Sequence, residues 1–373
     1  MKLGIPKEHT QNESRVAATP ETVKKLIAKG LTVLVEESAG VAANFPDTAY
    51  RNAGANIVNV EEALSAEIVF KVRRPNAEEI SMMKPMSTLV CLLEACTTDE
   101  TIQQLADAGI QSFALERIPR ISRAQTVDVL SSQSSIAGYR AAIKAAELYT
   151  RFFPMMMTSA GSAKPANLLV LGAGVAGLQA IATARKLGAR VYAYDVRPEV
   201  KEQVESLGAT FVEFNLDESA EGEGGYAKQL SESAQRQQQT LLAEELKKMD
   251  IIISTAMIPC RPAPVLITKE TVMGMHEGSV IIDMATATGG NCELSEQDKT
   301  LTRFGVTICG ETNLPGLMSG DASSFYARNL VNFIQLLLEE NENGVQLMHH
   351  ETDEITAAAI VTHQGEVRLS CVS

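Results

Sequence analysis

The first third of the chain alternates short apolar runs with amphipathic stretches. Apolar runs of four or five residues are separated by segments, such as 21–29 and 99–108, in which apolar residues recur at helical spacing. This alternation is typical of βα units, whose strands form a parallel sheet. The pattern predicts strands at 2–5, 32–36, 68–72, 88–92 and 111–115. No glycine fingerprint accompanies these strands.

A second series of the same kind begins at residue 167. It predicts strands at 167–171, 190–194, 210–214, 251–254, 279–283 and 306–309. The order of these segments along the chain favours a doubly wound sheet. The predicted fold class is therefore α/β, with two Rossmann-like domains that contain parallel sheets, the second of which carries a GxGxxG motif.

The domain boundaries follow from the segments outside these two series. Residues 117–135 are polar and basic, and 136–153 follow a helical pattern that leads into the second series. The helix predicted at 322–339 has apolar residues at core spacing and is expected to return to the first domain. Residues 340–373 are expected to form a peripheral tail. We predict a discontinuous first domain of 1–135 and 318–373, and a second domain of 136–317.

The second series opens with a motif that suits a dinucleotide phosphate. The apolar strand 168–171 is followed by Gly172, Gly174 and Gly177 in GxGxxG spacing, and then by a helical segment. The glycines permit a tight turn, a close approach to a pyrophosphate and close helix–strand packing, with the helix N-terminus facing the anion. The alternative is a glycine-rich turn without a ligand. Agreement of strand, turn and helix favours dinucleotide binding.

The residue after the next strand bears on the choice of cofactor. Asp195 lies about twenty residues beyond the motif, where a carboxylate can accept hydrogen bonds from the adenosine ribose. Its charge would repel the 2′-phosphate of NADP(H), whereas Arg197 could pair with that phosphate. We weigh the carboxylate more heavily, and the sequence therefore favours NAD(H).

Residues 216–226 combine acidic residues with glycine and predict a loop outside the core. A solvated surface loop is the simple interpretation. Tyr226 is a large aromatic next to Gly224 and Gly225, where loop closure could bring it over a ligand.

Composition excludes several classes of function. The 373 residues carry a formal net charge of −13, which disfavours nucleic acid and anionic membrane surfaces as partners. The six cysteines lack the pairing of metal ligands, and no metal is expected. No apolar run approaches the roughly 20 residues needed to span a bilayer. We therefore expect a cytoplasmic chain that does not cross a membrane by itself.

The polar segment 117–135 is the best candidate for the reacting end of a site. It contains Arg120, Gln125, Asp128 and Ser131, whose charged, amide and hydroxyl groups suit a ribose and a carboxamide. A solvated linker between domains explains the composition equally well. Its expected position at a domain junction favours function.

Several strings of residues match one known family. They are GIPKE and ESRVAATPETVKKL near the N-terminus, PRISRAQTVDVLSSQS at 119–134, VLGAGVAGLQAIATARKLGA at 170–189, DVRPEVKEQVESLGA at 195–209, GGYAK at 224–228, TAMIPCRPAPVLIT at 255–268 and IIDMATATGGNCE at 281–293. On these residues the chain resembles the NAD(H)-binding domain I, in the alpha subunit, of the Re/Si-specific, proton-translocating NAD(P) transhydrogenases. The segment PRISRAQ is the specific motif, whereas GAGVAG occurs in many dehydrogenases.

The resemblance implies roles for individual residues. Arg120, Gln125, Asp128 and Ser131 would surround the nicotinamide end of NAD(H). The remaining residues that it implies in cofactor binding are Gly172, Gly174, Val175 and Gly177 at the pyrophosphate, Asp195, Val196 and Arg197 at the adenosine ribose, Gly225 and Tyr226 in a mobile loop, and Thr255 and Met257 beside the nucleotide. Cys260 stands where the family usually has glycine.

The resemblance also implies partners. The chain would form a homodimer and exchange hydride with NADP(H), which is bound by a partner domain and not by this chain. A membrane-spanning proton channel would belong to the same complex, so the chain would lie peripherally on the inner face of the membrane.

Alanine dehydrogenase is the related alternative. That enzyme uses Arg, Lys, His and Asp at positions that here hold Arg15, Arg73, Leu93 and Ala287. Without the His and Asp, amino-acid oxidation lacks an evident proton path. Hydride transfer between two nicotinamides needs no such path, and Arg15 is then either structural or a remnant. A non-catalytic NAD(H) sensor is a third possibility.

Overall fold

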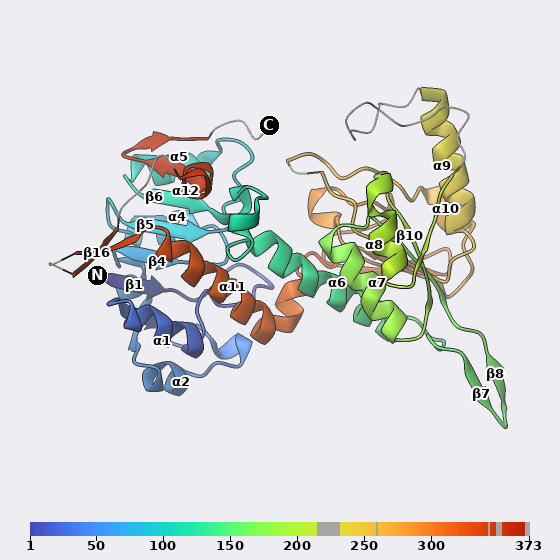
Figure 1. Ribbon diagram of the computed structural model, residues 1–373, viewed down its shortest axis with the longest axis horizontal. Coiled ribbons are helices and arrows are strands. Elements are labelled where there is room, and N and C mark those ends of the chain that lie inside the picture. The colour runs from blue at the N-terminus through green and yellow to red at the C-terminus, as the bar shows by residue number, and fades with distance from the viewer. Residues whose placement is uncertain (215–231, 259, 342–343, 348–352, 370–373) are drawn as a thin grey trace. The chain divides into compact units, whose positions relative to one another are not determined.

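The computed structural model describes residues 1–214, 232–258, 260–341, 344–347 and 353–369. The chain divides into two compact units (Figure 1). Unit 1 consists of Met1–Gln133 and Pro315–Ser373, and unit 2 consists of Ser134–Leu314. The sequence placed these boundaries after residues 135 and 317, so the structure moves them by two and three residues toward the N-terminus.

The described residues of unit 1 form an eight-stranded sheet in the order β19-β18-β6-β5-β4-β1-β2-β3. The strands are β1 (Lys2–Ile5), β2 (Thr32–Glu36), β3 (Asn56–Val58), β4 (Ile68–Phe70), β5 (Thr88–Cys91), β6 (Gln111–Ala114), β18 (Ile360–His363) and β19 (Glu366–Val367). The pairs from β3 through β6 are parallel. Sheet order therefore reverses between β1 and β4, as in a doubly wound fold.

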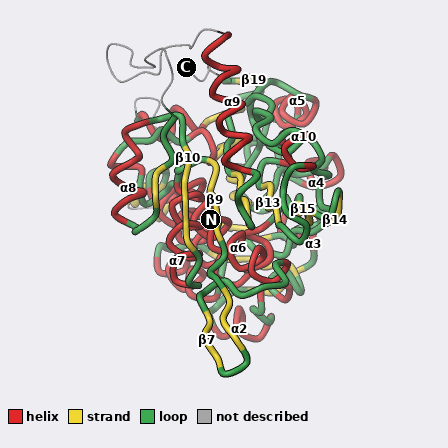
Figure 2. The backbone as a smooth tube through the Cα atoms, turned by 90° about the vertical axis from the view of Figure 1, so that its right-hand side faces the viewer, coloured by secondary structure: helices red, strands yellow, loops and turns green. Residues whose placement is uncertain are grey.

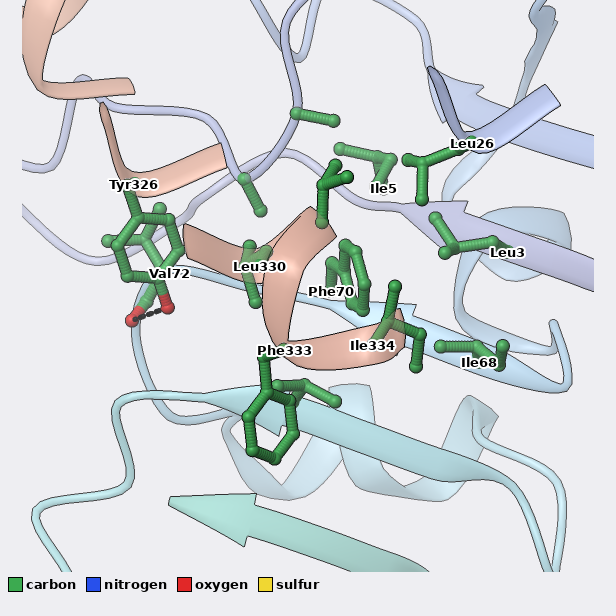
Figure 3. Packing of buried hydrophobic residues seen from close by; sticks show 14 of the residues in the cluster. Leu3, Ile5, Leu26, Ile68, Phe70, Val72, Tyr326, Leu330, Phe333 and Ile334 are labelled. Carbon is green, nitrogen blue, oxygen red and sulfur yellow. Dashed lines mark hydrogen bonds between the residues drawn. The ribbon is translucent and has the colours of Figure 1, made fainter. Parts of the chain in front are cut away.

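Helices cover both faces of this sheet. They are α1 (Pro20–Ala28), α2 (Asp47–Asn52), α3 (Val60–Leu64), α4 (Ala77–Met82), α5 (Glu100–Asp107), α11 (Ser319–Gln335) and α12 (Glu354–Ala359). Apolar residues of α1, α11 and α12 share one core with the sheet, and those of α3, α4 and α5 share the other. Figure 3 shows Leu330, Phe333 and Ile334 of α11 packed against Phe70 and Ile68 of β4.

The prediction of a peripheral tail is wrong. β18 pairs antiparallel with β6 and extends the sheet of unit 1, and β19 pairs with β18. The hydroxyls of Ser112 and Thr362 lie 2.7 Å apart and are buried. Ile355 and Ala359 of α12 lie in the core at 1% and 0% exposure. The short, mixed patches of this segment hid its role because their partners lie about 250 residues earlier.

The described residues of unit 2 form a seven-stranded sheet in the order β11-β10-β9-β12-β13-β15-β14. The strands are β9 (Asn167–Leu171), β10 (Arg190–Tyr194), β11 (Thr210–Phe211), β12 (Ile251–Ser254), β13 (Val280–Asp283), β14 (Thr300–Arg303) and β15 (Val306–Cys309). All pairs are parallel except β14 with β15. Without the antiparallel β14, the six parallel strands have the Rossmann order 3-2-1-4-5-6, which confirms the predicted α/β class.

Helices again lie on both faces. They are α6 (Val129–Leu148), α7 (Val175–Lys186), α8 (Lys201–Ser206), α9 (Glu232–Leu246) and α10 (Lys269–Met273). α6, α7 and α8 contribute to one apolar core, and α9 and α10 to the other. α6 begins at Val129, seven residues before the predicted start, so Ser131 lies on a helix and not in a linker.

Two further strand pairs lie outside the two main sheets. The strands β7 (Met156–Thr158) and β8 (Gly161–Ala163) form an exposed hairpin that extends away from the sheet of its own unit (Figures 1 and 2). β16 (Leu338–Asn341) pairs with β17 (Gly344–Leu347). Among the described residues, no helix combines the length and apolar character of a membrane span.

Candidate functional site

The glycine turn of unit 2 joins β9 to α7. Gly172 follows β9 with a φ of 93°, a left-handed conformation that glycine adopts without strain. Gly174 is the N-cap of α7, and a β-carbon there would meet nothing within 4 Å. Val175 opens the helix with 46% of its surface exposed. The turn therefore presents backbone at a helix N-terminus, which is the geometry that binds phosphate oxygens.

This turn lies where the strand order of unit 2 reverses. β9 pairs with β10 on one side and with β12 on the other, and Thr255 follows β12 directly. Its hydroxyl donates to the carbonyl oxygen of Gly172 at 3.0 Å and is 3.2 Å from that of Leu171. The Thr255 side chain therefore binds the backbone at the start of the turn. Met257, two residues farther on, is 54% exposed.

Asp195 follows β10 and contacts the same turn. Its Oδ2 accepts the backbone N–H of Ala173 at 2.7 Å, and both of its oxygens accept from the Arg197 guanidinium at 3.0 Å. Burial raises the pKa of the Asp195 carboxyl, but hydrogen bonds from Arg197 and Ala173 outweigh burial and hold the pKa below its usual value. The carboxylate is therefore ionised at neutral pH. Val196 between the two residues is 64% exposed.

The loop after β12 is fixed by a residue that sequence reasoning did not single out. Asn291 is fully buried, and its Nδ2 donates to the carbonyl oxygens of Ala256 and Pro264, each at 2.8 Å. Its Oδ1 accepts from the Ser254 hydroxyl at 2.6 Å. The backbone carbonyl of Asn291 accepts from the N–H groups at 266 and 267. One residue therefore holds both ends of the loop that contains Thr255 and Met257.

In unit 1, the structure brings two of the four predicted nicotinamide residues together. Asp128 immediately precedes α6, and its Oδ1 accepts the backbone N–H of Ser131 at 2.9 Å. Its Oδ2 accepts from the Ser131 hydroxyl. Arg120 and Gln125 are exposed. Both side chains lie on the stretch that leads to α6, and neither forms a hydrogen bond or ion pair with the residues that the structure describes.

Arg15, whose role the sequence left open, belongs to a buried ion cluster in unit 1. Its guanidinium donates to both oxygens of Glu13 at 2.7 and 2.6 Å, and to Oε1 of Gln133 at 2.8 Å. Arg73 donates to the same Glu13 at 2.9 Å. Arg15 is 4% exposed. It therefore joins the chain before α1 to the first turns of α6, which is a structural role.

Gly225 and Tyr226 lie outside the described residues, so the structure does not test the predicted loop closure. Leu93 is fully buried and Ala287 is exposed, and neither side chain can titrate. In the described ranges, no three His, Cys, Asp or Glu side chains gather as they would around a metal ion.

Comparison with known proteins shows one family whose two domains match this chain. Residues 4–137 match the model described as "Alanine dehydrogenase/PNT, N-terminal domain", and residues 141–370 match the corresponding C-terminal domain. The chain is 47% identical to an NAD(P) transhydrogenase subunit alpha polypeptide of Rhodospirillum rubrum, over 98% of this chain and 97% of that protein.

Two solved structures are similar over nearly the whole chain. A transhydrogenase from Sinorhizobium meliloti has a TM-score of 0.86 and 42% identity, with 98% of each chain covered. An L-alanine dehydrogenase has a TM-score of 0.81 and 25% identity, with 98% of this chain and 96% of the other covered. Both likenesses extend through unit 1 and unit 2.

Proposed function

The chain belongs to the alanine dehydrogenase/PNT family, and we propose that it is the NAD(H)-binding component of an NAD(P) transhydrogenase. The identity of 47% over almost the full length makes it a homologue of transhydrogenase alpha subunits, which are oxidoreductase subunits. The single observation within the structure that carries the proposal is the contact between Asp195 and the glycine turn. A carboxylate at that place suits the unphosphorylated ribose of NAD(H).

The cofactor supplies the hydride donor or acceptor when it is bound. In the proposed role, the backbone at Gly172, Gly174, Val175 and Gly177 binds the pyrophosphate. Asp195 accepts hydrogen bonds from the ribose, with Val196 and Arg197 at the edge of that subsite. In this structure the Arg197 guanidinium donates to both oxygens of Asp195. It has to move before a ribose hydroxyl can donate to this carboxylate. Thr255 and Met257 belong to the loop beside the nucleotide.

The four polar residues of unit 1 serve the nicotinamide end in this proposal. Arg120 and Gln125 are exposed donors, and Asp128 and Ser131 form a fixed pair. Gly225 and Tyr226 would close over the nucleotide and exclude water. Direct transfer of hydride from one nicotinamide C4 to another releases no proton, so positioning and dehydration are the contributions required of the protein.

The NADP(H) that exchanges hydride is proposed to lie on a partner domain of a Re/Si-specific, proton-translocating complex. That complex would contain a membrane-spanning proton channel and would hold this chain peripherally at the inner face of the membrane. We also propose a homodimer. Exposed methionines on the β7–β8 hairpin, among them Met157 at 77%, support assembly, because an isolated two-stranded hairpin is marginally stable until another surface covers it.

Binding and single-turnover measurements test the proposal. The full chain should bind NADH more tightly than NADPH and transfer little hydride alone. Stopped-flow mixing of the NADH-loaded chain with an NADP analogue on the partner subunit should show rapid transfer, which Gln125→Asn and Tyr226→Phe slow. Tighter binding of NADPH would contradict the cofactor assignment. Unchanged binding and rates in both variants would exclude the proposed site, and no transfer with any partner would favour an NAD(H) sensor.

An alanine-dehydrogenase activity is the second candidate, because an L-alanine dehydrogenase shares the fold with a TM-score of 0.81 and this chain retains Arg15. The positions at which that enzyme has a proton-transferring His and Asp hold Leu93 and Ala287 here. We therefore expect no oxidation of NADH when the chain is mixed with pyruvate and ammonia. Robust turnover in that assay would replace the transhydrogenase proposal.

A further inference from the structure

The segment 125–132 carries three of the proposed nicotinamide residues, Gln125, Asp128 and Ser131. It leads from the short 3₁₀ turn Ser122–Ala124 into the first turn of α6. A 20-residue helix follows it, but its beginning depends on local contacts because the first N–H groups of a helix have no intrahelical partner. The N–H of Ser131 is taken by Asp128. That bond lies within the segment and does not fix where the segment lies in unit 1. Contacts with other elements must do this.

One side chain of α11 bonds to two separated points of this segment. The Oδ1 of Asn329 accepts from the Ser132 hydroxyl at 2.8 Å, and its Nδ2 donates to the carbonyl oxygen of Thr126 at 2.8 Å. Asn329 is 8% exposed. Its amide therefore fixes the distance between residues 126 and 132, with Asp128 and Ser131 held between them.

Helix α11, which carries Asn329, is packed in the core of unit 1. Tyr326, Leu330 and Phe333 of α11 are fully buried in the core of unit 1. Figure 3 shows these residues against the sheet, with the Tyr326 hydroxyl hydrogen-bonded to the backbone at Val72. Because α11 packs on the sheet, Asn329 holds the segment 125–132 in a fixed position relative to the strands of unit 1.

A neighbouring asparagine provides a comparison within the same helix. Asn332 donates to the same Thr126 carbonyl oxygen, at 3.0 Å, but has no bond to Ser132. It is more exposed than Asn329. Only Asn329 of the two holds both ends of the segment.

We infer that Asn329 is a positioning residue for hydride transfer: its amide anchors the segment 125–132 at Thr126 and Ser132, so that Asp128 and Ser131 between these anchors, and Gln125 next to the first, meet the nicotinamide in one arrangement. The inference rests on the proposed function. A reaction without a general acid or base depends on approach geometry, and misplacement by about 1 Å can lower a rate by roughly 10²-fold. The main effect of losing Asn329 should therefore fall on the transfer rate, since the adenosine and pyrophosphate subsites lie in unit 2.

The test compares Asn329→Ala, Asn329→Asp and the control Asn332→Ala in the full chain. Asn329→Asp keeps an acceptor for Ser132 but turns an oxygen toward the Thr126 carbonyl. Both Asn329 variants should slow hydride transfer to the NADP(H)-loaded partner by about 10- to 100-fold. Their Kd for NADH should stay within about twofold, and Asn332→Ala should stay within about threefold of the parent in both quantities.

Amide hydrogen exchange gives a readout that does not depend on turnover. The amides of Val127, Ser131 and Ser132 should exchange faster in the Asn329 variants, while those of Leu330–Ile334 stay protected. Transfer rates within about threefold of the parent would overturn the inference. So would a joint loss of NADH binding and α11 protection, because that result describes a residue needed only for folding.

Gln125→Asn, measured in parallel, separates this inference from the proposed function. If Gln125→Asn slows transfer and the Asn329 variants do not, the site stands and the positioning role is wrong. If Gln125→Asn has no effect, the proposed site fails, and with it the basis for a role of Asn329 in catalysis.

Discussion

A β-carbon on Gly177 would lie 1.8 Å from the carbonyl oxygen of Gly172, whereas one on Gly174 would have nothing within 4 Å. Gly177 therefore permits close packing of α7 on the turn, and Gly174 leaves open space beside it. We predict that Gly177→Ala lowers both the melting temperature and the affinity for NADH. Gly174→Ala should keep the melting temperature and lose roughly tenfold or more in affinity, because the methyl group occupies the space of the pyrophosphate.

Thermal unfolding and NADH titration of the two variants check this pair. Equal effects on stability would contradict the packing argument. Full NADH affinity in Gly174→Ala would show that the pyrophosphate does not approach this turn.

Asp195 should set the preference for NAD(H). Asp195→Ala removes the acceptor for the ribose and the charge that repels a 2′-phosphate, so the Kd for NADH should rise about 10- to 100-fold and the preference over NADPH should shrink. Arg197→Ala is the control, because it releases the Asp195 carboxylate from an internal ion pair. That variant should retain its preference for NADH. A preference that survives Asp195→Ala and vanishes in Arg197→Ala would reverse these assignments.

Glu13 should stabilise unit 1 in a pH-dependent way. Burial alone raises the pKa of Glu13, but hydrogen bonds and charge from Arg15, with the charge of Arg73, lower it from about 4.5 to about 2. A carboxyl whose folded pKa is depressed contributes stability above its unfolded pKa and loses it as pH falls through the folded value. Glu13→Gln should therefore cost about 3 kcal/mol at pH 7, with the difference from the parent shrinking between about pH 4.5 and 2.

Glu21 is the matched control for this measurement. Hydrogen bonds from Arg328 and Lys25 also lower the pKa of Glu21 to about 2, but half of its side chain is exposed. Because water and salt screen such pairs, Glu21→Gln should cost about 1 kcal/mol or less. Urea unfolding at several pH values compares the two variants, and equal losses would show that burial does not decide the strength of these pairs.

Asn291 should be required for the loop that follows β12. Asn291→Asp replaces the donor to Ala256 and Pro264 with an acceptor, which leaves two carbonyl oxygens facing a carboxylate oxygen. We expect a loss of stability of about 2–4 kcal/mol and weaker NADH binding. Ser295→Ala is the control, because Ser295 bonds to Asp283 and not to this loop. Unchanged NADH affinity in Asn291→Asp would separate the loop from the nucleotide site.

The sequence alone predicted much of the two sheets. Strands such as Lys2–Ile5, Asn167–Leu171 and Ile251–Ser254 have the predicted bounds, because a short apolar run between turn residues is a local signal. The tight turn at Gly172 was also predicted correctly, since glycine adopts the positive φ of this position without strain. Local patterns of this kind also revealed the α/β class and the resemblance to a family.

Other features became visible only in the tertiary structure. The short strand Asn56–Val58 and the antiparallel Thr300–Arg303 were not predicted, since their stability comes from a neighbouring strand more than from their own pattern. The start of α6 was predicted seven residues too late, because its first two turns are rich in serine and its beginning is fixed by Asp128 and by α11.

For the candidate site, local sequence patterns identified the chemical groups available: the glycine turn, the carboxylate of Asp195 and the polar residues of 117–135. Tertiary structure decided how these groups are supported, through Asn291 in unit 2 and Asn329 in unit 1, and it placed the C-terminal strand Ile360–His363 beside β6. The physical reason is separation along the chain. Asn329 bonds to a residue 203 positions away, and no local periodicity or propensity records a partner at that distance.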